Sequence, residues 1–146
     1  MGAEIVQHPA MWRAVVAFVG IYDMLRNEAI TENAVFNITE YGSVKDPAQF
    51  KALYGYSPYQ HVVDGIEYPA VLFLTGANDP RVNPANSRKM VARLQAATGS
   101  RAPILLRTSA TSGHGVDTGL DEQIEEKADA WAFVFDQLGL SVTSSR

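Results

Sequence analysis

The sequence predicts an α/β fold with a three-stranded, mostly parallel sheet and flanking helices. Two observations support this prediction: three short apolar runs have the length of buried strands, and segments with helical spacing lie between and after them. Continuous apolar runs are typical of parallel strands that are covered on both faces. Because strands alternate with helices along the chain, right-handed crossovers would place the strands side by side in one sheet.

The three apolar runs are the candidate strands, and a short helix is expected before the first of them. The strands are predicted at 13–20, 70–76 and 103–108. Residues 1–8 form the expected helix, and Pro9 ends it because the residue before a proline avoids the α region. This helix has no capping residue of its own, which indicates the end of a helix whose start is missing.

Two helices are predicted before the third strand. A short one is expected at 47–54, within a long irregular stretch that is rich in aromatic residues. The other begins where Asn83 can cap a helix and Pro84 can occupy its first position, and Gly99 is expected to close it. Its apolar residues fall on one face: Met90, Val91, Leu94 and Ala97.

The last helix is predicted to begin near 117–118 and to stop at Gly139. Its apolar residues recur at steps of three and four, namely Leu120, Ile124, Ala128, Trp131, Phe135 and Leu138. We expect this face to be buried, with Trp131 and also Trp12 filling the core.

The composition excludes several classes of protein. The chain has 146 residues, the usual length of one domain, with 47% hydrophobic and 19% charged residues, which excludes a disordered polymer. A nucleic acid is not expected as a partner, because the net charge is −4 and the basic residues are scattered along the sequence. The absence of cysteine excludes disulfides, thiolate zinc sites and a cysteine nucleophile. No apolar run is long enough for a membrane span and no signal peptide is evident, so we expect a soluble, cytoplasmic protein.

Two loops that follow predicted strands carry the candidate chemistry. Asp79 follows the second strand, and His114 follows the third between two glycines. In open α/β sheets, ligands bind at the carboxyl ends of the strands, and an Asp followed by a His is the order of acid and base in a hydrolase triad. Each residue also has an ordinary interpretation: Asp79 can begin a turn before Pro80, and His114 can be an exposed loop histidine.

Several short motifs, taken in order, resemble the C-terminal part of the prolyl oligopeptidase family. The resemblance covers nearly the whole chain and rests on Val19-Gly20, Asp23-Met24-Leu25, Glu40-Tyr41-Gly42, Tyr56-Ser57-Pro58, the run 68–75, Asp79, Arg81-Val82, Pro84, Ser87 and Gly113-His114-Gly115. It implies a partial α/β-hydrolase fold in which residues 1–146 are the C-terminal portion of the catalytic domain. The family consists of serine hydrolases that cut short peptides, so a short peptide or ester is the implied substrate.

The resemblance also implies roles for individual residues. Asp79 would be the acid and His114 the base of a Ser-Asp-His triad. Arg81 would hold a substrate carbonyl, while Val82, Ile21 and Tyr41 would line the specificity pocket. No cofactor is implied, and the sequence contains no glycine-rich phosphate loop after any strand. His61 and Asp64 form no convincing metal pair, because a third ligand is missing.

The nucleophile that a triad requires has no candidate in this sequence. The motif Gly-x-Ser-x-Gly is absent, and neither Ser57 nor Ser112 is placed on a predicted strand-to-helix turn. The resemblance implies that the serine precedes Met1, so we expect the chain to be inactive alone. Alternatives are an esterase-type piece of the same fold and a binding or assembly module without a nucleophile.

Two further expectations concern specificity and assembly. Proline-selective members of the family place a tryptophan four residues before the tyrosine that Tyr41 matches, whereas this chain has Asn37. An amide lacks the apolar face that stacks on proline, which argues against strict proline preference.

The first strand, apolar and uncharged, is expected to form an exposed sheet edge through which copies of the chain associate.

Overall fold

The computed structural model describes residues 1–31, 34–115 and 118–141. Its centre is a parallel sheet of three strands in the order β1-β2-β3, which comprise Ala14–Phe18, Ala70–Gly76 and Ile104–Ser109. Ala14 pairs with Ala70 and Val71 pairs with Ile104, so all three strands end at the same edge of the sheet. The predicted fold class, number of strands and parallel direction are confirmed.

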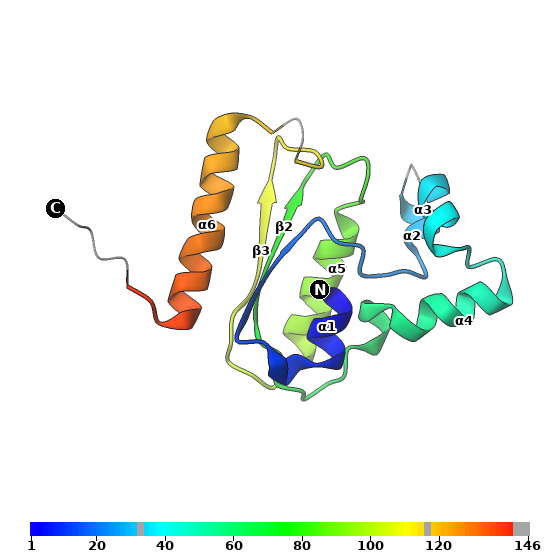
Figure 1. The fold of residues 1–146 in the computed structure, drawn as a ribbon, viewed down its shortest axis with the longest axis horizontal. Helices are drawn as coiled ribbons and strands as arrows, with labels where there is room; N and C mark the ends of the chain where they lie inside the picture. The colour runs from blue at the N-terminus through cyan, green and yellow to red at the C-terminus, as the bar shows by residue number, and fades with distance from the viewer. Residues whose placement is uncertain (32–33, 116–117, 142–146) are drawn as a thin grey trace.

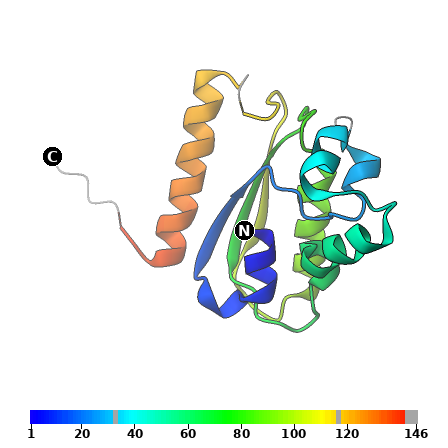
Figure 2. The same cartoon turned by 45° about the vertical axis from the view of Figure 1, so that its right-hand side comes forward.

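The central strand β2 forms the core of the molecule because every one of its residues is buried. Helices cover both faces of the sheet, as Figures 1 and 2 show from two directions. Outside the sheet, the described residues form two short 3₁₀ helices and six α-helices. The 3₁₀ helices are η1 (Pro9–Met11) and η2 (Pro58–His61), and the α-helices are α1 (Gly2–Gln7), α2 (Asn27–Ile30), α3 (Ala34–Tyr41), α4 (Pro47–Tyr56), α5 (Ala85–Ala97) and α6 (Leu120–Leu138).

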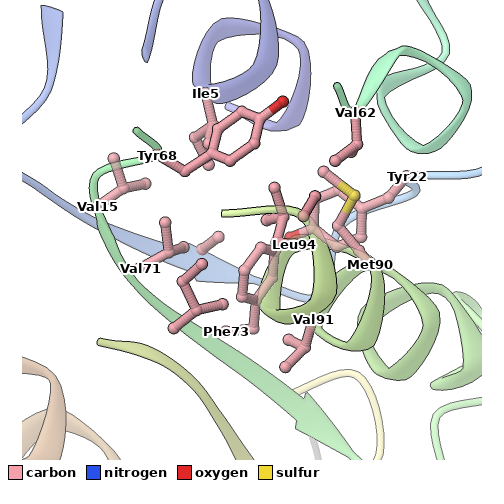
Figure 3. Close-up of a cluster of buried hydrophobic side chains, with 13 residues drawn as sticks. Ile5, Val15, Tyr22, Val62, Tyr68, Val71, Phe73, Met90, Val91 and Leu94 are labelled. Carbon is pink, nitrogen blue, oxygen red and sulfur yellow. The ribbon is translucent and has the colours of Figure 1, made fainter. Parts of the chain in front are cut away.

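The two faces of the sheet carry apolar clusters of different size. On the larger side, Val71 and Phe73 of β2 pack with Ile5 of α1 and with Leu94 of α5, as Figure 3 shows. Trp12 is half-buried against this cluster, as predicted. On the smaller side, Ala70, Leu72 and Leu74 of β2 pack with Phe133 of α6. Most of the apolar burial of this chain therefore lies between the sheet, α1 and α5.

The stretch between β1 and β2 contains more helix than the sequence predicted. The expected helix at 47–54 is α4, and the Asp46 carboxylate caps it by accepting hydrogen bonds from Ala48 N and Gln49 N, both at 2.9 Å. The helices α2 and α3 were not predicted. The sequence of α3 is rich in Val, Phe, Asn, Ile and Thr, which have weak helix propensity, so packing with α2 decides its conformation.

The helix α5 has the predicted apolar face, but it begins at Ala85, so Pro84 lies at the N-cap and not at the first helical position. Asn83 Oδ1 accepts a hydrogen bond from Ala85 N at 2.9 Å, and the four apolar residues expected to face the core are all buried. The helix ends at Ala97 with Thr98 as its C-cap, so Gly99 follows the end of the helix directly, as predicted, but without the left-handed φ that is typical of a closing glycine. Gly99 instead lies against the backbone of Gly65, where an added Cβ would come within 2.7 Å of the Gly65 carbonyl oxygen. This glycine provides close packing rather than a helix cap.

The helix α6 has the predicted end but not the predicted buried face. Gly139 adopts a left-handed conformation with φ of +66° and closes the helix. The helix begins at Leu120 with Gly119 at its N-cap, slightly later than the expected start near 117–118, of which Asp117 lies outside the described residues. The face expected to be buried is exposed instead: Trp131 is 61% exposed and Ile124 is 57% exposed, whereas Phe133 is only 8% exposed. Ion pairs from Arg107 on β3 to Glu122 and Asp129 bind the Phe133 side of the helix to the sheet.

β1 lies at one edge of the sheet, beside β2 alone. Its residues are uncharged, and Phe18 at its end is 50% exposed.

Within the described residues, every helix is too short or too polar to cross a membrane.

Candidate active site

Asp79 lies in the loop that follows β2, and its carboxylate is fully buried. Oδ1 accepts hydrogen bonds from the backbone N–H groups of Arg81 and Val82, each at 2.9 Å. Oδ2 lies 2.8 Å from Nδ1 of His114. The two interpretations of Asp79 are therefore compatible, since one carboxylate oxygen forms the turn and the other faces the histidine.

The loop that carries His114 is bound tightly to the Asp79 loop. Ala77 N donates to Ser109 O at 2.8 Å, and the side-chain amide of Asn78 donates to Ala110 O at 3.0 Å. Gly76 allows this approach, because a Cβ at this position would come within 2.3 Å of the Gly113 carbonyl oxygen. The backbone thus sets the distance between the carboxylate and the imidazole.

The contact with Asp79 determines which nitrogen of His114 is available for chemistry. A carboxylate accepts hydrogen bonds, so Nδ1 carries the proton and Nε2 retains its lone pair. The His114 side chain is 25% exposed, while that of Asp79 is inaccessible to solvent. This arrangement suits a general base: the buried carboxylate orients the ring and stabilises its charged form.

A hollow of about 340 Å³ opens beside His114. It brings His114 together with all four residues that the family resemblance assigned to substrate binding, Ile21, Tyr41, Arg81 and Val82. These residues come from three separate parts of the chain: the loop after β1, the end of α3 and the Asp79 loop. The fold therefore brings together residues that lie far apart in the sequence.

The sequence reasoning did not assign five other residues that line this hollow, Val19, Met24, Asn37, Glu40 and Tyr56. Asn37 was noted only as a departure from the family, and Glu40 and Tyr56 belong to short motifs that carried the resemblance. Val19 adopts a φ of +40°, a conformation that a β-branched residue rarely adopts and that is common near functional sites.

The hollow is lined by two tyrosine hydroxyls, one glutamate and one arginine. Burial raises the pKa of the Tyr41 hydroxyl, and the neighbouring Glu40 carboxylate raises it further. Burial also raises the pKa of Tyr56. Both phenols are therefore neutral hydrogen-bond donors at neutral pH. The exposed Arg81 supplies a cation beside them, so the lining of the hollow combines polar groups that can bind a peptide backbone with the apolar side chains of Ile21, Met24 and Val82.

A buried polar network supports the loop after β1. The Asp23 carboxylate is bonded by Lys89 of α5 and accepts a hydrogen bond from Gln60 Nε2 at 2.8 Å. Asn86 Oδ1 accepts hydrogen bonds from Tyr22 N and Asp23 N, both at 3.2 Å. Burial disfavours the charged form of Asp23, but the hydrogen bonds from Lys89 and Gln60 outweigh it and lower its pKa. This network connects one wall of the hollow to α5.

The two serines examined as nucleophiles have structural roles. Ser57 is fully buried, and its hydroxyl oxygen is bonded to Gln60 and accepts a hydrogen bond from Met24 N at 2.9 Å. Ser112 is buried in the histidine loop, where its backbone N–H donates to Ser109 Oγ at 3.0 Å.

Among the described residues, no three His, Cys, Asp or Glu side chains lie close enough to share a metal ion. His61 Nε2 lies 2.6 Å from Tyr54 O, and the Asp64 carboxylate pairs with Arg93.

Parallel strands followed by an Asp loop and a His loop at one edge of the sheet are typical of α/β-hydrolases. The profile of the Prolyl oligopeptidase family matches residues 1–141, and the chain belongs to this family. The prolyl endopeptidase of Dictyostelium discoideum is 39% identical over 136 residues, which cover 91% of this chain and 18% of that protein. Prolyl oligopeptidase ophP of Omphalotus olearius is 39% identical over 150 residues, covering 96% of this chain and 20% of that protein.

Solved structures give the same assignment. A structure from a study of two prolyl endopeptidases superposes with a TM-score of 0.90 and 38% identity, over 96% of this chain and 20% of that chain. Oligopeptidase B from Leishmania major superposes with a TM-score of 0.91 and 25% identity, over 99% of this chain and 20% of that one. The chain therefore spans about a fifth of the length of the relatives that it matches.

Proposed function

We propose that this chain supplies the acid and the base of a Ser-Asp-His peptidase and is inactive alone. The observation that carries this proposal is the 2.8 Å contact between Asp79 Oδ2 and His114 Nδ1 at the rim of a hollow. No Gly-x-Ser-x-Gly motif occurs in the 146 residues, so the nucleophile comes from polypeptide outside them. Residues 1–146 are the C-terminal portion of the catalytic domain.

In the proposed reaction, His114 Nε2 acts in turn as a base and as an acid. As a serine hydroxyl attacks the scissile carbonyl, Nε2 takes its proton, and Asp79 stabilises the resulting imidazolium through Nδ1. Nε2 then returns this proton to the leaving amine as the carbon–nitrogen bond breaks. A water molecule then attacks the acyl-enzyme while Nε2 takes one of its protons, and Nε2 returns this proton to the serine oxygen as the bond to the acyl group breaks. No cofactor takes part in these steps.

The hollow beside His114 holds the substrate in this proposal. The Arg81 guanidinium donates a hydrogen bond to a peptide carbonyl, and Ile21, Val82 and Tyr41 contact the side chain that precedes the scissile bond. Asn37 places an amide at this hollow, where stacking on proline needs an apolar ring. The specificity is therefore broader than proline.

The experiment that tests this proposal restores the missing polypeptide in trans. The chain is mixed with Dictyostelium prolyl endopeptidase from which the 136 matched residues are deleted, and hydrolysis of an acyl-prolyl and an acyl-alanyl p-nitroanilide is measured. We expect no turnover by either part alone and turnover by the mixture. His114→Ala lowers this turnover by at least about 10³-fold, whereas His8→Gln, at an exposed position, leaves it unchanged.

The other outcomes separate the alternatives. Turnover by a mixture that carries His114→Ala would refute the assignment of the base. A complex without turnover would favour a binding or assembly module, and hydrolysis of a p-nitrophenyl ester alone would favour an esterase. An Asn37→Trp variant is expected to shift the ratio of prolyl to alanyl turnover toward proline, and an unchanged ratio would contradict the role of Asn37.

We also propose that, in the absence of other polypeptide, copies of this chain associate through the free edge of β1. Edge strands without charged residues offer unpaired backbone groups to a second strand. Light scattering at micromolar concentration is expected to show a dimer or larger species, and Phe18→Lys to favour the monomer. The matched control is Leu105→Lys, also about half-exposed but on β3 at the opposite edge. A monomeric parent chain would contradict this proposal.

A further inference from the structure

The loop between β1 and α2 carries three of the side chains that line the hollow beside His114, namely Val19, Ile21 and Met24. This loop contains neither helix nor strand, so no regular hydrogen-bond ladder fixes its backbone. Its position depends instead on the groups to which its N–H donors are bonded. The same groups therefore determine the shape of this part of the hollow.

The buried side chain of Asn86, the second residue of α5, binds this loop. Asn86 Oδ1 accepts hydrogen bonds from the backbone N–H groups of Tyr22 and Asp23, both at 3.2 Å. All three residues are almost completely buried, with exposed fractions between 1% and 3%, so solvent offers no ready replacement for this acceptor. Figures 1 and 2 show the loop crossing α5 close to the beginning of the helix, where Asn86 lies.

Asn86 is bonded to the Asp79 loop as well. Its backbone N–H and its side-chain Nδ2 both donate to Asn83 O, at 3.0 Å and 3.3 Å. The residue before Asn83 is Val82, which lines the hollow and whose N–H donates to Asp79 Oδ1 at 2.9 Å. One buried amide therefore joins two loops that contribute side chains to the same hollow.

A second side chain extends this arrangement along the loop after β1. Ser57, between α4 and η2, is fully buried, and its Oγ accepts a hydrogen bond from Met24 N at 2.9 Å. Three consecutive N–H groups, those of residues 22, 23 and 24, are thus bonded to side-chain oxygens. Ile21 precedes these residues and Met24 is the last of them, so a change in this backbone would move both side chains within the hollow.

We infer that Asn86 is a positioning residue that determines how the hollow receives the side chain of the substrate. Without its Oδ1, two buried N–H groups lack an acceptor, so the loop shifts to regain one and carries Ile21 and Met24 with it. The inference rests on the proposed function, because it takes the hollow as the binding site for the residue before the scissile bond. The effect falls on the fit of this residue and not on proton transfer by His114, whose ring is held by Asp79.

The test compares two substrates that differ in the residue before the scissile bond. The chain replaces the 136 matched residues in Dictyostelium prolyl endopeptidase, and kcat and KM of this chimera are measured with an acyl-prolyl and an acyl-glycyl p-nitroanilide. Glycine has no side chain to contact the hollow. We expect Asn86→Leu to raise KM for the prolyl substrate at least about fivefold, while kcat and both constants for the glycyl substrate change less than about twofold. A loss of folded enzyme would instead lower the turnover of both substrates equally.

Three further variants separate positioning from stability. Gln95→Leu makes the same change of an amide to leucine on α5, but this amide donates to Ile104 O at the start of β3, so the ratio of prolyl to glycyl kcat/KM should be unchanged. Asn86→Asp keeps an acceptor for both N–H groups and should restore most of the ratio. Ser57→Ala removes one oxygen and should lower the ratio in the same direction as Asn86→Leu, which keeps the test decisive if Asn86→Leu does not fold.

Binding distinguishes a failure of this inference from a failure of the proposed peptidase function. Dissociation constants of the acyl-prolyl and acyl-glycyl amides are measured by calorimetry with the same chimeras. A parent chimera that prefers the prolyl amide but hydrolyses neither substrate would contradict the peptidase proposal, and loss of this preference in Asn86→Leu would still support the inference. Equal effects of Asn86→Leu and Ser57→Ala on the prolyl and glycyl ligands, or a parent chimera without any preference, would overturn it.

Discussion

The helices α5 and α6 have equally clear apolar periodicity in the sequence, yet they use it in opposite ways. The apolar face of α5 is buried against β2 and β3, with Met90 and Leu94 fully inaccessible. The apolar face of α6 points away from the sheet, and Phe133 from its other side makes the contact. Periodicity therefore shows that a helix has an apolar face, but not which partner covers this face.

The largest expected effect comes from the buried face of α5. Leu94→Ala removes a fully buried side chain from the main apolar cluster and leaves a cavity, so we expect a loss of about 3 to 4 kcal/mol in the free energy of unfolding. Urea denaturation followed by circular dichroism measures this loss. A loss below about 1 kcal/mol would show that the contact of α5 with the sheet is not the core of this chain.

The polar side of α5 is expected to contribute next. Lys89→Met removes the cation that pairs with the buried Asp23 carboxylate, although hydrogen bonds from Gln60 and Arg26 remain. We expect a loss of about 2 to 3 kcal/mol in the free energy of unfolding. Lys51→Met, at an exposed position of α4, is the control and should change stability by less than about 0.5 kcal/mol. Equal effects of the two substitutions would contradict a specific role for Asp23.

The same pair predicts how stability depends on pH. The pKa of Asp23 is lowered in the folded chain, so ionised Asp23 stabilises the fold above its unfolded pKa of about 3.9. This stabilisation is lost as the pH falls through the lower pKa of the folded state. Urea midpoints recorded from pH 6 to pH 2 should decline less steeply for Asp23→Asn than for the parent chain. An identical decline in both proteins would contradict this prediction.

The contact of α6 with the sheet is expected to be weaker than that of α5. Arg107→Gln removes ion pairs with Glu122 and Asp129 that are only partly buried, so we expect a loss of about 1 kcal/mol. Raising the salt concentration should reduce the difference between Arg107→Gln and the parent chain. A difference that is insensitive to salt would indicate that Arg107 acts through packing of its aliphatic stem.

The smallest effect is expected on the exposed apolar face of α6. Trp131→Gln alters a side chain that is 61% exposed, so we expect a change of less than about 0.5 kcal/mol in the stability of the isolated chain. The same substitution at Leu94, on α5, should prevent folding or cost more than Leu94→Ala. A large destabilisation by Trp131→Gln would mean that this face of α6 already has a partner within this chain or in a second copy.

The candidate site shows the same division between local and tertiary information. The positions of Asp79 and His114 were predictable because each follows a strand whose apolar run is unmistakable, and parallel strands end at one edge. The 2.8 Å contact between them required Gly76, whose lack of a side chain admits the histidine loop. The contribution of Glu40 to the hollow depended on helix α3, for which the local sequence carries only a weak signal, and that of Met24 depended on the loop after β1, where Met24 N donates a hydrogen bond to Ser57 Oγ.

The sequence by itself determined the three strands, the helix α5, the end of α6 at Gly139 and the order of the Asp and His loops. These features follow from short-range chemistry: continuous apolar runs, a capping asparagine and a glycine with positive φ. Only the tertiary structure decided which face of α6 meets the sheet and which residues surround His114. Both depend on contacts between residues far apart in the chain, because burial is a property of neighbours in space and not of neighbours in sequence.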